Sequence, residues 1–398
     1  MECSLEPKLF RDIENNTFLN VIRYMHAHYK PLHAYICVCI CIFGLITNAL
    51  NVIILSCPRM RTSINVVLTG IALCDIGTMI SYLIYVSLFS FQASRSFSSM
   101  CFIMLHMFLS VVLHSSSLWL AVVVAFIRRL ILDQASVYSR WMSTRRAWLV
   151  VFYSTMLISL LTVPSLFTYS IQVWGYDPMN QTIYTVDASV FAKANQCALF
   201  KAVLWLHGIA FKVIPCTLLA ILISCLVVTL RAAQKRRHAL LGPKRASVGS
   251  DRTTILLLTI VSISLLTEIP QGLVVIFSGI SLDVTYNLYP YVADILDLLS
   301  LINSSINFFL YCIMSSRYRH TFWIVLLPKR IYIRVCNEDC NTDFITKQNH
   351  YLNMKSVAGP LNNGCTTMLT KPGPNSEYPA TTDRPEDNLS AHESDEYL

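Results

Sequence analysis

Seven blocks of apolar residues, each longer than 20 residues, constrain the fold of this chain more than any other feature of its sequence. A helix needs about 20 such residues to cross roughly 30 Å of hydrocarbon. The 398 residues are 54% hydrophobic and only 14% charged, with a mean hydropathy of +0.52, whereas soluble domains carry about a quarter charged residues. A large buried core is the alternative, but core helices keep a polar face and most of these blocks lack one. The sequence therefore predicts an all-α membrane protein.

The membrane spans are expected at residues 34–57, 64–90, 102–130, 147–171, 202–230, 254–280 and 289–314. Nineteen Arg and Lys residues fall in the gaps or at the span ends on one side of the membrane and seven on the other, and cytoplasmic segments carry the excess. We therefore expect an extracellular N-terminus at residues 1–33 and a seven-transmembrane-helix bundle at 34–314, in the plasma membrane. Sequons at Asn15 and Asn180 fall on the outer side, where glycosylation is feasible. This distribution of the +8 net charge argues against a nucleic-acid partner.

The segment after the last span has its own pattern. Residues 315–328 mix basic and aromatic side chains, which is typical of an amphipathic juxtamembrane helix that lies on membrane lipid. Cys336 and Cys340 follow, either as palmitoylation sites or as ordinary free thiols. Residues 329–398 are polar and predict a disordered cytoplasmic tail, open to phosphorylation and able to engage arrestin.

Ionisable side chains inside the spans are costly in hydrocarbon, so each needs a reason to be there. Asp75 and Glu268 lie mid-span and must face a cavity or one another. Lys212 and Asp294 lie nearer the outer surface, where they could extend towards water instead. The histidines of the spans are interpreted as interior groups with satisfied hydrogen bonds. No nucleophile, base and oxyanion set stands out, and no Cys–His spacing indicates a metal site, so neither an enzyme nor a resident cofactor is expected.

Three strings of residues carry a resemblance to a known family: Arg252-Thr253-Thr254, Thr267-Glu268-Ile269-Pro270-Gln271-Gly272 and the run from Leu301 to Ser315. With them the chain resembles rhodopsin-like G-protein-coupled receptors and, among these, the myosuppressin and FMRFamide-type neuropeptide receptors of invertebrates, grouped with the Srw families of nematodes. The match runs through residues 30–325. It implies a receptor for an amidated, RFamide-like neuropeptide that signals through a heterotrimeric G protein.

The resemblance also implies roles for individual residues. Arg128 matches the arginine that meets the G protein, and Tyr311 the tyrosine that swings inward on activation. This sequence departs from the usual pattern beside Arg128, since Ile127 replaces an acid and Arg129 a tyrosine. The polar cluster that holds a sodium ion in many relatives matches Asp75, Ser117, Asn303 and Asn307. Cys101 and Cys197 match the pair whose disulfide ties the third span to the second outer loop.

The ligand's charge can be matched to carboxylates of the outer halves of the spans. An RFamide peptide carries a guanidinium, which pairs well with a carboxylate. Asp297 is the first choice because it precedes Asn307 by ten residues, about 15 Å of helix rise. An interhelical hydrogen bond is the alternative role for Asp297. Glu268 is the runner-up, although it could share a proton or an ion with Asp75 instead. Asp294 and Lys212 complete the candidate ligand-binding set.

Two other functions remain open at this level. The same fold serves chemosensory receptors for small external molecules, and a membrane transporter or channel could use the intramembrane charges as a pathway. The third span has no acid to anchor an amine and the seventh has no lysine for retinal, which disfavours those two ligands.

Overall fold

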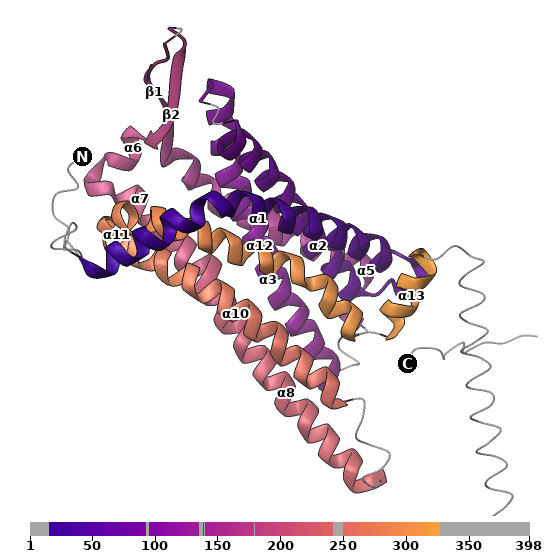
Figure 1. Ribbon diagram of the computed structural model, residues 1–398. Coiled ribbons are helices and arrows are strands. Elements are labelled where there is room, and N and C mark those ends of the chain that lie inside the picture. The colour runs from indigo at the N-terminus through magenta and orange to yellow at the C-terminus, as the bar shows by residue number, and fades with distance from the viewer. Residues whose placement is uncertain are drawn as a thin grey trace, which may run out of the picture. The chain divides into compact units, whose positions relative to one another are not determined.

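The computed structural model describes residues 16–92, 95–134, 138, 140–178, 180–241, 250–314 and 316–326. All of them belong to the unit Met1–Ile333; a second unit, Arg334–Leu398, covers most of the predicted tail. Asn15, Cys336, Cys340 and residues 329–398 lie outside the described residues. In the described part, seven helices are long and apolar enough to cross a membrane, which confirms the predicted bundle (Figure 1).

The spans follow the predicted order along the chain. They are α1 (Thr17–Leu55), α2 (Ser63–Val86), α3 (Phe97–Asp133), α5 (Thr144–Thr162), the continuous run α7 (Ala198–Trp205), η5 (Leu206–Val213) and α8 (Ile214–Leu241), then α10 (Ser250–Ile280) and α12 (Tyr289–Met314). Shorter elements are α6 (Val190–Lys193), α11 (Leu282–Asn287) and α13 (Ser316–Leu326). The segment η5 is a π-helix, a form that is rare and concentrated at functional sites.

Several predicted boundaries differ from the structure by a few residues or more, and two of them have a clear local cause. Helix α1 starts at Thr17 rather than residue 34, because the side chain of Asn16 accepts hydrogen bonds from the backbone N–H groups of Phe18 and Leu19 and so caps the helix. Pro31 lies inside this helix. Helix α5 ends at Thr162 rather than residue 171 and continues as a 3₁₀ turn that contains Pro164, because proline cannot donate the backbone hydrogen bond of an α-helix.

A β-hairpin follows α5 and was not predicted. Strand β1 (Tyr169–Tyr176) pairs antiparallel with β2 (Thr182–Ala188), from Tyr169 opposite Ala188 to Tyr176 opposite Thr182. Asn180 is exposed in the connecting turn with a φ of 60°, so the sequon is accessible. The backbone N–H of Tyr184 donates to the carbonyl of Arg95 just before α3. We call this end of the bundle the hairpin end and the opposite one the α13 end (Figure 1).

The predicted disulfide between Cys101 and Cys197 is wrong. Cys101 carries a free thiol that is exposed on α3, whereas Cys197 is disulfide-bonded. The two cysteines have different surroundings, and the backbone turns sharply at Gln196 and Cys197, whose φ values are 55° and 60°. This turn buries Cys197 in an apolar cluster with Phe200 and Leu282.

The α13 end is closed by the largest apolar cluster, which joins α1, α2, α3 and α5. Tyr318 of α13 is buried in it and donates a hydrogen bond of 2.6 Å from its hydroxyl to Asn51 Oδ1 of α1. Phe322 packs against the same cluster while Trp323 is exposed. Helix α13 therefore lies within the predicted range 315–328, with one face packed on the bundle and Trp323 exposed; its contact with lipid stays a prediction.

Candidate functional site

A cavity of about 470 Å³ opens among α2, α3, the η5 segment, α10 and α12 at the hairpin end. Its size falls in the range of about 300–1,000 Å³ that is usual for ligand sites. One wall is aromatic, because the rings of Tyr85 and His106 stack at 4.8 Å with Tyr82 5.9 Å from His106. Thr168 and Tyr169, at the base of the hairpin, also line it. The cavity is therefore hydrophobic on one side and is covered by the segment that follows α5.

Asp297 lines this cavity, as expected for a ligand contact. Tyr82 of α2 is a near neighbour of this carboxylate and lines the same cavity, and the interhelical hydrogen bond considered as an alternative stays a prediction. The Tyr82 hydroxyl lies 2.9 Å from Nε2 of His33 on α1. Asp297 and Tyr82 thus both face the ligand space.

Asp294 has a different environment, one helical turn before Asp297. Its Oδ2 lies 3.2 Å from Nε2 of His26, and its Oδ1 lies 3.9 Å from Nε2 of His33. Both histidines come from the extended first helix, which the sequence did not predict to begin so early. Asp294 is not among the residues that line the cavity, so its contacts tie α12 to α1.

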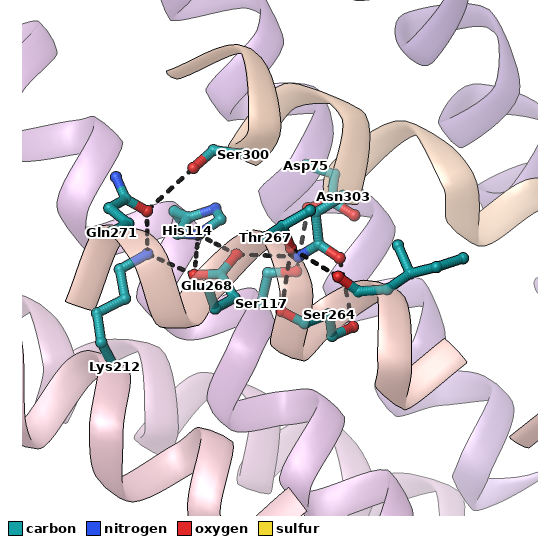
Figure 2. A network of polar contacts seen from close by, with 11 residues as sticks. Asp75, His114, Ser117, Lys212, Ser264, Thr267, Glu268, Gln271, Ser300 and Asn303 are labelled. Atoms are coloured by element: carbon teal, nitrogen blue, oxygen red, sulfur yellow. Dashed lines mark hydrogen bonds and ion pairs between the residues drawn. The ribbon is translucent and has the colours of Figure 1, made fainter. Parts of the chain in front are cut away.

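Glu268 is fully buried, with no solvent exposure, and is the centre of a polar network shown in Figure 2. Lys212 Nζ donates to its Oε2 at 2.6 Å, and His114 Nε2 lies 3.0 Å from both carboxylate oxygens. Asn303 Nδ2 donates to Oε1 at 3.1 Å. Lys212 therefore points inward from η5 instead of extending to the surface. The oxygens of Glu268 are occupied by these partners and Glu268 lines neither described cavity, so a ligand contact at Glu268 stays a prediction.

The predicted sodium cluster comes together only in part. Ser117 Oγ donates to Asp75 Oδ1 and Asn307 Nδ2 donates to Asp75 Oδ2, each at 3.0 Å. Asn303 belongs instead to the network of Glu268 and accepts from Ser264 Oγ at 3.3 Å. The two buried acids therefore have separate partners, and no hydrogen bond joins them among the described residues.

Arg128 and Tyr311 line the same smaller cavity, of about 100 Å³, towards the α13 end. Arg129 points elsewhere: it pairs with Asp133 at 2.6 Å, donates to the carbonyl of Cys225 at 3.0 Å, and also donates to the Thr229 hydroxyl. Arg129 thus ties α3 to α8, and the arginine and tyrosine predicted to act in signalling share one space.

Comparison with known proteins decides the family. Residues 35–329 match the family model described as serpentine type 7TM GPCR chemoreceptor Srw. The chain belongs to the Srw family of G-protein-coupled receptors. It is 32% identical over 383 residues to the G-protein coupled receptor dmsr-1 of Caenorhabditis elegans, with 83% of this chain and 75% of that protein covered.

The names of two further relatives include a peptide. The sex peptide receptor of Drosophila melanogaster is 27% identical, with 75% of this chain and 73% of that protein covered. The FMRFamide receptor of the same species is 23% identical, with 73% and 53% covered. This Srw chain is accordingly a multi-pass signalling receptor and not an enzyme. The transporter or channel alternative is abandoned, because the family and these relatives are receptors.

Several site residues of this Srw receptor were missed. The sequence predicts an ordinary interior histidine at His114 and assigns no role to Tyr82, Gln271 or Ser300. A signal was present for His114, because a buried carboxylate such as Glu268 requires donors from other helices. Nothing in the sequence indicated which helices would supply them.

Proposed function

We propose that this receptor binds an amidated peptide of the RFamide type and signals through a heterotrimeric G protein. The observation that carries the proposal is Asp297, a carboxylate that faces a cavity of about 470 Å³ near the mouth of the bundle. A guanidinium can pair with it through two parallel hydrogen bonds. The aromatic wall formed by Tyr85 and His106 offers a surface for the ring of the neighbouring phenylalanine. The names of the FMRFamide and sex peptide receptors support a peptide ligand.

The proposal includes the setting of the receptor. The excess of Arg and Lys on the α13 side supports a plasma-membrane location with the hairpin end outside, where Asn15 and Asn180 would be glycosylated. Asp75, with Ser117 and Asn307 around it, is proposed to hold a sodium ion. The tail is proposed to bind arrestin, and α13 to lie on lipid.

Substitution of Asp297 tests the ligand assignment. Asp297→Asn should raise the half-maximal concentration of an Arg-Phe-amide peptide about 10- to 100-fold, since a charge-assisted hydrogen bond contributes about 1.5–3 kcal/mol. Calcium or cAMP reporters in transfected cells, corrected for surface expression, measure this. Asp294→Asn is the matched control on the same helix, because its partner is His26, and should leave potency within about twofold.

A change in the peptide completes the test. Citrulline in place of its arginine removes the charge but keeps the shape, so it should weaken the peptide on the wild type and have little further effect on Asp297→Asn. Equal losses on both receptors would show that the guanidinium binds elsewhere.

The family description favours one alternative, a small external molecule as ligand. A panel that combines amidated peptides with small odorant-like compounds separates the two. A response to small molecules alone would replace the peptide assignment.

A further inference from the structure

We propose that Gln271 and Ser300 form a subsite for a primary carboxamide, the chemical group at the end of an amidated peptide. The proposal rests on the proposed function, because it places the amidated end in one part of the same cavity. Gln271 comes from α10 and Ser300 from α12, and both line the cavity of about 470 Å³. Both are only partly buried, so a ligand can reach them.

The direction of each hydrogen bond around Gln271 follows from the chemistry of its neighbours. Glu268 is an acceptor, and Lys212 has only donors. Lys212 Nζ lies 2.7 Å from Oε1 of Gln271, so the oxygen of the amide must face the lysine. The Nε2 group then points away from the lysine, as Figure 2 shows.

The same logic orients Ser300. Its Oγ lies 3.1 Å from Oε1 of Gln271. Because that oxygen is an acceptor, the hydroxyl must donate its single hydrogen to it. The lone pairs of Ser300 are left for other partners. The ion pair with Glu268 holds Lys212 in place, and Lys212 orients the amide of Gln271. Gln271 in turn orients the hydroxyl of Ser300 on α12.

The result is a donor beside an acceptor on the cavity wall: the N–H groups of Gln271 and the lone pairs of Ser300. A primary carboxamide has the complementary pair, a carbonyl oxygen that accepts from Gln271 and an N–H that donates to Ser300. A carboxylate has only acceptors, so at Ser300 it would meet lone pairs unless the hydroxyl left Gln271. The carboxylate of Asp297 in the same cavity also repels a second negative charge.

The spacing of Asp297 and Ser300 matches the end of such a peptide. They are three residues apart on α12, so they share a helix face with side chains about 5–6 Å apart. An arginine side chain at Asp297 and the terminal amide at Ser300 are within the reach of the dipeptide Arg-Phe-amide. The two contacts would together select a ligand that has both a positive charge and an amidated end.

The test compares two probes, Arg-Phe-amide and the free acid Arg-Phe, on the purified full-length receptor in lipid nanodiscs. Dissociation constants are obtained from the shift of Tm with probe concentration. The wild type should bind the amide at least about tenfold more tightly than the acid. Ser300→Ala should bring the two within about twofold, whereas Ser300→Thr, which keeps the hydroxyl, should retain the preference. Gln271→Met should weaken both probes, because both carbonyl groups accept from its nitrogen.

Ser305→Ala is the matched control, since Ser305 lies on the same helix but donates to its own backbone at Leu301 O; it should keep the wild-type ratio. Equal affinity of the wild type for amide and acid would overturn the subsite and leave peptide binding intact. An unchanged ratio in Ser300→Ala would overturn the part assigned to Ser300. Absence of binding by either probe would overturn the subsite and the proposed peptide function together.

Discussion

At the scale of single residues, the buried charge of Glu268 depends on its partners. Its carboxylate has no solvent exposure, and a lone charge in such a place is costly. Lys212→Met should therefore lower the stability of the receptor by about 3–5 kcal/mol, the usual cost when one partner of a buried pair is removed. The double variant Lys212→Met/Glu268→Gln should recover most of the loss, because neither charge then remains. Thermal unfolding of the purified receptor measures both.

An exposed pair of the same kind provides the control for this prediction. Lys193 Nζ and Asp187 Oδ2 are 3.1 Å apart near the hairpin, with side chains 34% and 51% exposed. Surface pairs contribute only about 0–1 kcal/mol, so Lys193→Met should unfold at nearly the wild-type temperature. If Lys212→Met were as stable as Lys193→Met, the pair with Glu268 would not be what stabilises the network.

The sequence predicted which residues matter better than it predicted their contacts. Asp75, Ser117 and Asn307 were expected together and are together. Glu268 and Lys212 were each recognised as intramembrane charges, but their pairing across 56 residues was not predicted. Helical spacing identifies only neighbours within one helix, whereas contacts between helices depend on how each helix is rotated and packed.

At the scale of elements, apolar length alone located every span, because crossing hydrocarbon requires it. The ends were less predictable, since they depend on single groups such as the Asn16 cap of α1. The hairpin was missed for a similar reason. Its strands of eight and seven residues alternate weakly between polar and apolar residues, and their pairing depends on a turn rather than on burial.

The contact between η5 and α10 yields a prediction about packing. A Cβ at Gly208 would lie 2.7 Å from Cγ1 of Ile276 and 3.4 Å from its backbone nitrogen. Gly208→Ala should therefore force the two helices apart and destabilise the receptor by about 1–3 kcal/mol, as overpacking does. Gly175→Ala is the matched control, because a Cβ there meets nothing within 4 Å. Equal unfolding temperatures for the two variants would show that η5 and α10 are not closely packed at this point.

At the scale of the whole molecule, two cavities are joined by the network around Glu268. His114 lines both the cavity at the hairpin end and the smaller one towards the α13 end, and it contacts Glu268. Asn303 lines the smaller cavity and donates to the same carboxylate. Because these residues border both cavities, the network offers a physical route by which a ligand at Asp297 could bias the helices beside Arg128.

Substitutions of the neighbouring residues Arg128 and Arg129, at the α13 end of that route, should have different effects. Arg128 lines the smaller cavity with Tyr311, whereas Arg129 is engaged with Asp133 and with the carbonyl of Cys225 on α8. Arg128→Ala should abolish agonist-stimulated G-protein activation while ligand binding and surface level persist, because its side chain lines a cavity and makes no hydrogen bond or ion pair between helices within the described part of the chain. Arg129→Ala should keep coupling but lower the unfolding temperature, since α3 and α8 lose a shared set of hydrogen bonds.

An energy-transfer assay of G-protein dissociation, run beside surface labelling and thermal unfolding, distinguishes the two variants. Normal signalling by Arg128→Ala would show that the role implied by the family resemblance does not belong to this residue, and a loss of coupling in Arg129→Ala alone would transfer that role to its neighbour.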